Sequence, residues 1–185
     1  MIACEDTRHT GQLIKILEER YAKILDILPN AGRRYVSVRD WNEAQMVDKV
    51  IMELTQNDVA LVSDAGTPLL SDPGFKVVRA VRAAGGTVTP VPGVFAGAVA
   101  ASVAGLPTNK IMFLGFLPKK WVLLPATTTI IYESPVRLEK TVQELKTKYP
   151  TAQIVIASEL TKIHEYVGEE IHNKGEAVIL AYLAE

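Results

Sequence analysis

The chain has 185 residues, of which 48% are hydrophobic, and it carries a formal net charge of −1 at pH 7. These proportions are typical of a folded protein with an apolar core, and no apolar run reaches the roughly 20 residues that a membrane-spanning helix needs. Because the charge is balanced in both halves of the chain, a broad basic surface is excluded, and any contact with nucleic acid must use a local patch.

The first half of the chain alternates predicted strands and helices. Short valine-rich runs are typical of buried parallel strands, and apolar residues at helical spacing indicate the helices between them. Asp72 is suited to cap a helix whose first residue is Pro73. The predicted elements are, in chain order, strand 35–38, helix 44–54, strand 59–62, helix 73–84, strand 87–91 and helix 94–104.

The second half begins after the proline-containing stretch 106–109, so we place a domain boundary there and expect domains 1–107 and 108–185. Ser134 and Pro135 are suited to cap and begin the helix of this half. The predicted elements are strand 111–114, strand 128–132, helix 135–148, strand 153–157 and strand 176–182. The sequence therefore predicts an α/β fold of two small domains with a ligand cleft between them.

The loop at residues 63–74, Ser-Asp-Ala-Gly-Thr-Pro-Leu-Leu-Ser-Asp-Pro-Gly, lies between a predicted strand and a predicted helix. Ligands of α/β proteins bind at the carboxyl ends of strands, where such loops lie. The loop is longer than a plain connector needs, and Gly66 allows its backbone to approach a ligand closely. We interpret the loop as a small-molecule site; from the residues alone, a tight turn capped by aspartate is an equal alternative.

Six further motifs accompany this loop along the chain. They are Glu-Asp-Thr-Arg-His-Thr-Gly at 5–11, Pro-Gly at 92–93, Gly-Leu-Pro-Thr at 105–108, Gly-Phe-Leu-Pro-Lys-Lys at 115–120, Tyr-Glu-Ser-Pro at 132–135 and Glu-Leu-Thr-Lys at 159–162. In this order, the motifs and the loop resemble the tetrapyrrole methylase superfamily. Within it, they are most similar to the branch that methylates a cytidine 2′-hydroxyl of small-subunit ribosomal RNA.

The resemblance implies S-adenosylmethionine as the cofactor, a mostly parallel N-terminal sheet, a mixed C-terminal sheet and a cofactor cleft between the domains. It also implies an apolar strand and a Gly-rich loop ahead of Met1, where this sequence starts. The residues that match the cofactor-binding positions of the family are Asp64, Ala65, Gly66, Thr67, Phe95, Ala96, Tyr132, Leu160, Gly175, Glu176 and Ala177.

A hydroxyl group that attacks a methyl carbon benefits from a nearby base. The candidate bases are Glu133, Glu5 and His9, which the sequence does not rank. Glu133 has a plain alternative, because a carboxylate near a helix N-terminus is favourable without any catalytic role. Arginine and lysine side chains suit RNA phosphates, and the candidate substrate-binding residues are Arg8, Arg137, Lys119, Lys120 and Lys162.

The expected function is methyl transfer to a cytidine 2′-hydroxyl of 16S ribosomal RNA, with ribosomal RNA or the small ribosomal subunit as partner and, by the resemblance, a homodimer. No metal is expected, because the chain has no ligand spacing such as His-Glu-x-x-His. The single cysteine and the lack of a signal-peptide pattern indicate the cytoplasm. The alternatives are C-methylation of a tetrapyrrole and a non-catalytic nucleoside-binding α/β protein.

Overall fold

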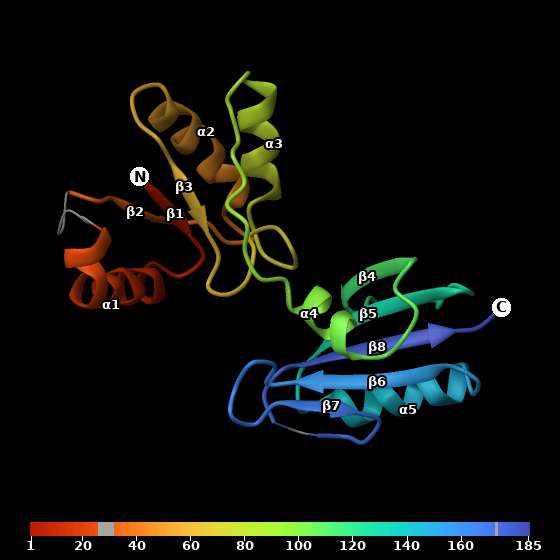
Figure 1. The fold of residues 1–185 in the computed structure, drawn as a ribbon. Coiled ribbons are helices and arrows are strands. Elements are labelled where there is room, and N and C mark those ends of the chain that lie inside the picture. Colours follow the sequence, from red (N-terminus) through yellow and green to blue (C-terminus); the bar gives the residue numbers. More distant parts are fainter. Residues whose placement is uncertain (26–31, 173) are drawn as a thin grey trace. The chain divides into compact units, whose positions relative to one another are not determined.

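The computed structural model describes residues 1–25, 32–172 and 174–185. The chain divides into two compact α/β units, Met1–Gly93 and Val94–Glu185 (Figure 1). The segment between Gly93 and Pro107 contributes a helix to the second unit. The domain limits 1–107 and 108–185 stay a prediction.

The first unit has a three-stranded parallel sheet in the order β2-β1-β3. The prediction of a parallel N-terminal sheet is therefore confirmed. Its core consists of small and branched apolar residues from the sheet and from two of the helices. The elements are β1 (Ile2–Cys4), α1 (Thr7–Leu25), β2 (Tyr35–Ser37), α2 (Glu43–Leu54), β3 (Ala60–Val62) and α3 (Phe75–Ala83).

The central strand of this sheet, β1, was not predicted. Ile2 pairs with Tyr35 on one side and with Ala60 on the other, and Ala3 and Cys4 are fully buried. Strands β2 and β3 are equally short, but they lie in valine-rich runs, whereas β1 has no such run. Its position at the centre of the sheet depends on the two longer-range pairings.

Helix α3 begins two residues later than predicted, and neither Asp72 nor Pro73 begins it. Its first residue is Phe75, and the preceding Gly74 has φ 129°. Leu69 and Ser71 in the same loop also have left-handed backbone angles, with φ 75° and 71°. A distant acceptor replaces the local cap, because Oε1 of Glu43 accepts the backbone N–H groups of Gly74 at 2.9 Å and Lys76 at 2.6 Å.

The strand predicted at residues 87–91 is wrong, because residues 86–95 have no regular secondary structure. Pro90 and Pro92 have no backbone N–H and cannot contribute to a ladder in the middle of a sheet. Val91, which a buried strand would cover, is 84% exposed. The valines of this segment therefore gave a false strand signal.

The second unit has a five-stranded mixed sheet in the order β4-β5-β8-β6-β7. Strands β4 and β5 are parallel and the other pairs are antiparallel, so the predicted mixed sheet is confirmed. Strand β7 was not predicted. The elements are α4 (Ala96–Val103), β4 (Ile111–Phe116), β5 (Thr127–Glu133), α5 (Leu138–Lys148), β6 (Gln153–Ser158), β7 (Tyr166–Gly168) and β8 (Ala177–Leu183).

Two helices cover the two faces of this sheet. Leu138 and Leu145 of α5 pack against one face together with Ile131. Ala100 of α4 packs against the other face, where the neighbouring residue Ile130 points. Helix α5 starts at Leu138 rather than at residue 135, because a turn occupies the residues between β5 and the helix.

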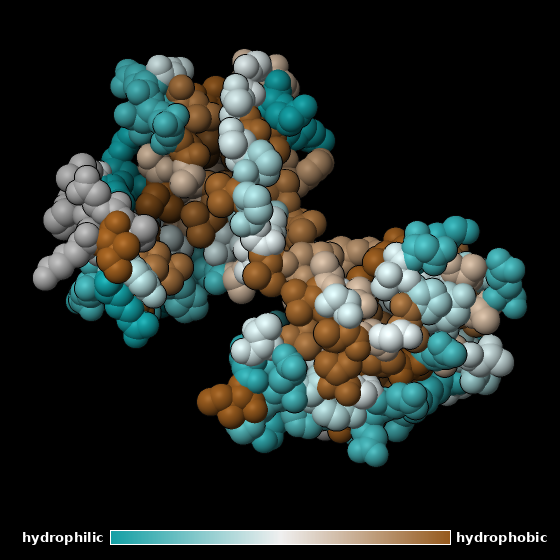
Figure 2. All heavy atoms as spheres, viewed as in Figure 1, coloured by the Kyte–Doolittle hydropathy of each residue, from teal (hydrophilic) through white to brown (hydrophobic). Residues whose placement is uncertain are grey.

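The surface of both units mixes polar and apolar side chains on the face drawn in Figure 2. Among the exposed apolar side chains, Val136 and Ile163 are 92% and 97% exposed. In the described part of the chain, no helix is both long enough and apolar enough to cross a membrane.

Candidate cofactor and catalytic site

The carboxyl ends of the three parallel strands of the first unit lie side by side. Cys4 at the end of β1 pairs with Ser37 of β2 and with Val62 of β3. The residues that follow these strands therefore gather at one edge of the sheet, where α/β proteins bind their ligands. They are Glu5, Asp6, Arg39 and Asp64.

Asp64 connects the loop after β3 to the start of α1. Its Oδ1 accepts the backbone N–H of Asp6 at 3.2 Å, and its Oδ2 lies 2.9 Å from Nδ1 of His9. Two residues that the sequence proposed for different roles, cofactor binding and base catalysis, are thus brought into direct contact.

Asp6 caps helix α1 and holds two arginines at the same edge. It accepts the backbone N–H of Arg8 at 2.8 Å, and its Oδ2 lies 2.9 Å from the Arg8 guanidinium and 3.1 Å from that of Arg39. The hydrogen bonds from Arg8 hold the pKa of the Asp6 carboxyl well below its usual range. Asp6 is therefore ionised at neutral pH.

Arg39 was not among the predicted site residues. Its Nε donates to the carbonyl oxygen of Glu5 at 3.0 Å and also contacts Oγ of Ser37 at 3.3 Å. Asn42 fixes the backbone of Arg39, since Oδ1 of Asn42 accepts its N–H at 2.7 Å. A signal was present in the sequence, because Arg39 is the first charged residue after the valine-rich run at 35–38.

Further carboxyl groups lie close to Asp64. Burial, followed by the charge of Asp64, raises the pKa of the Glu5 carboxyl. Burial also raises the pKa of Asp72, as do the charges of Asp64 and Asp40. The carboxyl groups of Glu5, Asp64 and Asp72 therefore lie close enough to interact at this edge of the sheet.

The backbone of the loop 64–67 is open to the close approach of another group. Residues 64–66 are exposed, and Gly66 has φ 69°. A Cβ on Gly93 would stand 3.1 Å from Oγ1 of Thr67 and 3.8 Å from the carbonyl oxygen of Gly66. The bare backbone of Gly93 thus lies against the loop.

In the second unit, predicted site residues meet at the end of β5. Glu133 pairs with Ala177 of β8, and Ala177 pairs with Ser158 of β6. Tyr132 precedes Glu133, and Leu160, Gly175 and Glu176 flank the paired strands. The sheet therefore brings together residues that are up to 45 positions apart in the chain.

Glu133 is 3% exposed, and its carboxylate is fully engaged. Oε1 accepts the backbone N–H of Ser134 at 2.8 Å and the Nε–H of Arg137 at 2.8 Å. Oε2 accepts the hydroxyl of Thr141 at 2.8 Å. These contacts fasten the turn between β5 and α5, so the geometry favours a structural function for Glu133 and Arg137. Their predicted catalytic and substrate-binding functions stay predictions.

Tyr132 belongs to an aromatic cluster that includes the predicted cofactor residue Phe95. The ring of Phe113 lies 4.9 Å from that of Phe95 and 5.1 Å from that of Tyr132, in edge-to-face contacts. The Tyr132 hydroxyl accepts the N–H of Gly97 at 3.3 Å, which places the start of α4, including Ala96, beside the cluster.

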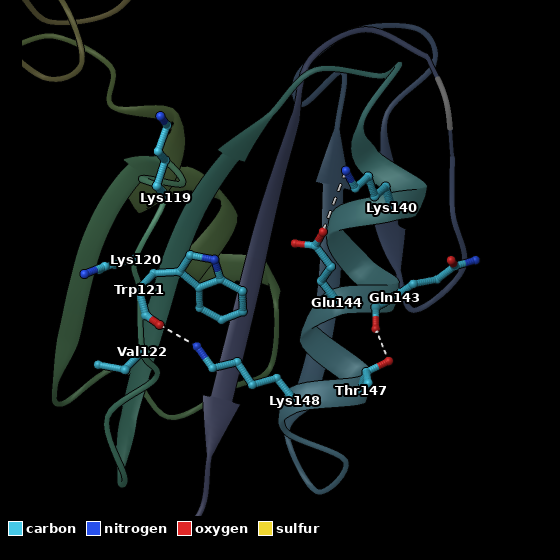
Figure 3. Close-up of a pocket in the computed structure, with 9 residues that line it drawn as sticks. All are labelled: Lys119, Lys120, Trp121, Val122, Lys140, Gln143, Glu144, Thr147 and Lys148. Atoms are coloured by element: carbon cyan, nitrogen blue, oxygen red, sulfur yellow. Dashed lines mark hydrogen bonds and ion pairs between the residues drawn. The ribbon is translucent and has the colours of Figure 1, made fainter.

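The predicted substrate lysines occupy different surroundings. Lys162 makes an ion pair of 3.0 Å with Glu159 just after β6. Lys119 and Lys120 line a pocket beside α5 (Figure 3). Lys119 and Lys120 thus lie beside α5, whereas Lys162 lies just after the end of β6.

The pair Ser158 and His172 was not predicted. Oγ of Ser158 lies 3.0 Å from Nδ1 of His172, and the His172 ring stacks on Tyr166 at 4.9 Å. No pattern in the sequence connects these residues. Across the described ranges, no group of His, Cys, Asp and Glu side chains is arranged to hold a metal ion.

The family described as Tetrapyrrole (Corrin/Porphyrin) Methylases matches residues 1–170. The chain belongs to this family. The resemblance seen in the motifs is therefore confirmed, and S-adenosylmethionine is the cofactor, as predicted.

Among curated relatives, the chain is similar to proteins named Ribosomal RNA small subunit methyltransferase I. It is 39% identical to that of Xylella fastidiosa over 204 residues, which cover 97% of this chain and 70% of the relative. It is 35% identical to that of Escherichia coli O157:H7, with 100% of this chain and 63% of the relative covered. The chain thus spans about two thirds of the length of these relatives.

Solved structures show the same fold. Uroporphyrin-III-C-methyltransferase from Thermus thermophilus matches with a TM-score of 0.56 at 20% identity, over 81% of this chain and 74% of that chain. A second structure of that enzyme, complexed with S-adenyl homocysteine, matches with a TM-score of 0.53 at 16% identity, over 97% of this chain and 96% of that chain. The predicted fold class is confirmed.

Proposed function

We propose that this chain methylates small-subunit ribosomal RNA, with S-adenosylmethionine as the methyl donor and a cytidine 2′-hydroxyl of 16S RNA as the acceptor. The observation that carries the proposal is the similarity to the small-subunit methyltransferases, at 39% identity over 97% of this chain in the relative from Xylella fastidiosa. The acceptor hydroxyl of cytidine comes from the resemblance of the motifs to one branch of the family.

The cofactor is held at the sheet edge of the first unit. When bound, it supplies a methyl group on a positively charged sulfur. The carboxyl side chains of Glu5, Asp64 and Asp72 suit a positive charge at this edge, and the exposed residues 64–66 supply backbone carbonyl and amide groups for the nucleoside. Because a sulfonium methyl has a good leaving group, positioning supplies much of the rate.

His9 is the candidate base that the geometry favours. With Nδ1 bonded to the Asp64 carboxylate, a neutral imidazole presents Nε2 as the acceptor for a proton. The His9 side chain is 65% exposed, so a ribose hydroxyl can reach it. Glu133, in contrast, already accepts hydrogen bonds at both of its oxygens.

The test is to incubate the protein with methyl-labelled S-adenosylmethionine and small ribosomal subunits, and to digest the RNA with alkali. A methylated 2′-oxygen blocks alkaline cleavage, so we expect the label in an alkali-stable dinucleotide that contains cytidine. Label on a base, or label only on a tetrapyrrole offered in parallel, would overturn the proposal. Cofactor binding without transfer to any substrate would support a non-catalytic protein instead.

A further inference from the structure

A basic pocket lies between the segment after β4 and the outer surface of α5, entirely within the second unit (Figure 3). Its volume is about 1010 Å³. Lys119, Lys120 and Trp121 line it from the segment, and Lys140, Glu144 and Lys148 line it from the helix.

The floor of the pocket is fixed by Trp121 and Lys148. The ammonium of Lys148 lies 4.1 Å from the centre of the Trp121 ring and donates to the Trp121 carbonyl oxygen at 2.6 Å. Tyr149 supports the same wall, since its hydroxyl accepts the N–H of Leu123 at 3.0 Å. The pocket is therefore formed before any ligand arrives, which lowers the entropic cost of binding.

The charge of the pocket is positive although the chain is slightly negative overall. Glu144 is the one acidic lining residue, and its carboxylate lies 3.9 Å from the Lys140 ammonium, with both side chains largely in solvent. An exposed pair at this distance neutralises little. Within the described residues, neither Lys119 nor Lys120 forms an ion pair, so their charges are available to a ligand.

We propose that this pocket binds the sugar-phosphate backbone of the RNA substrate. Lysines on both walls suit a ligand that carries a row of negative charges, and the exposed lining suits a chain that passes across the pocket. The Trp121 ring holds the Lys148 ammonium at the floor of the pocket, where this lysine adds to the positive charge. The identity of the ligand as RNA rests on the proposed function; the position and charge of the pocket do not.

The test compares two triple variants that lose the same charge. Lys119→Gln/Lys120→Gln/Lys140→Gln removes pocket lysines, and Lys49→Gln/Lys110→Gln/Lys146→Gln removes exposed lysines outside it, one of them on α5 itself. Affinity for small-subunit ribosomal RNA is measured across a salt series. Because each phosphate contact contributes about 0.7 to 0.9 to the salt slope, we expect the pocket variant to lose about 2 units of slope and at least about tenfold in affinity. The control keeps its slope.

A local readout comes from Trp121. The chain has two tryptophans, so Trp41→Phe leaves Trp121 as the only one, and RNA is expected to change its fluorescence. Three outcomes would each overturn the assignment of the pocket to RNA. They are equal salt slopes for the two triple variants, an unchanged Trp121 fluorescence and the absence of RNA binding. Methyl transfer to RNA is measured separately. Transfer with equal salt slopes for the two triple variants would retain the proposed function and reject the pocket as an RNA site. Binding that depends on the pocket lysines, without transfer, would retain the pocket and reject the proposed function.

Discussion

His9 and Asp64 are 55 positions apart in the chain, and their side chains meet at 2.9 Å between Nδ1 and Oδ2. The second oxygen of the same carboxylate accepts the backbone N–H of Asp6. One side chain therefore fixes both the start of α1 and the orientation of an imidazole. A change at Asp64 should affect cofactor binding and proton transfer together, whereas a change at His9 should affect proton transfer alone.

The first prediction concerns Asp64. Hydrogen bonds to a charged group contribute about 1.5–3 kcal/mol each, so Asp64→Ala is expected to weaken S-adenosylmethionine binding by about tenfold or more, as measured by calorimetry. Asp64→Asn keeps the shape and one acceptor and should weaken binding less. His9→Ala serves as the contrast, with near-normal cofactor affinity and slow methyl transfer. Unchanged affinity in Asp64→Ala would remove the loop from the cofactor site.

The second prediction concerns the long-range cap of α3. Glu43 is 4% exposed and accepts two backbone N–H groups at the start of the helix. Glu43→Ala leaves both donors without their acceptor, and we expect the free energy of unfolding to fall by about 2–4 kcal/mol in urea denaturation. Asp48→Ala, an exposed change in the same helix, should stay within about 0.5 kcal/mol of the unchanged protein. Equal stability of the two variants would contradict the cap.

The third prediction separates structure from catalysis at Glu133. If its carboxylate fastens the turn before α5, Glu133→Ala should lower the free energy of unfolding by about 2–4 kcal/mol, because the backbone N–H of Ser134 and the hydroxyl of Thr141 lose their acceptor. Thr141→Val removes one donor and should cost about 2 kcal/mol, whereas the exposed Thr147→Val should cost little. A stable Glu133→Ala protein with lost turnover would restore Glu133 as the base.

The fourth prediction uses the opposite pKa shifts of Asp6 and Glu5. The pKa of Asp6 is lowered, mainly by Arg8, from an ordinary value of 3.8. Above that pH the ionised group stabilises the fold, and below it the unfolded chain takes up the proton first, so the stabilisation is lost. Asp6→Asn should therefore unfold at a lower urea concentration than the unchanged protein at pH 7, and this difference should shrink below pH 3.8.

Glu5 gives the reverse sign. Burial and the charge of Asp64 raise its pKa above 4.5, so its ionised form opposes folding and stability falls as the pH rises through that value. Glu5→Gln should gain stability relative to the unchanged protein at pH 7 and lose the gain near pH 4. Parallel pH profiles for Asp6→Asn and Glu5→Gln would show that the two carboxyls are not in the surroundings described.

Local sequence patterns predicted most of the helices and strands. Strands β2 and β3 were found because valine-rich runs end at clear breaks, and α2 because its apolar residues keep a helical period. Strand β1 was missed, since Ile-Ala-Cys at 2–4 contains no valine-rich run of the kind that marked β2 and β3. The first residue of α3 was wrong because its cap comes from Glu43, 31 residues away, and no local rule can anticipate such a partner.

The candidate site shows the same limit. Asp64 and His9 were each chosen from their motifs, but their contact depends on the pairing of β1 with β3. Arg39 was missed although it follows a predicted strand. The candidate site residues were chosen from the sequence motifs, and Arg39 lies outside them. The three hydrogen bonds to the Glu133 carboxylate also need the tertiary structure, since Thr141 lies two helical turns further on.

The left-handed angles of Leu69 and Ser71 bear on how far the loop can be moved between proteins. Side chains other than glycine avoid this conformation, so the twelve residues do not encode their own path. Surrounding groups impose it, including the carboxylate that arrives from α2. If this peptide were grafted onto another scaffold, its sequence would be kept but its conformation would be lost, unless the scaffold also supplied an equivalent of Glu43.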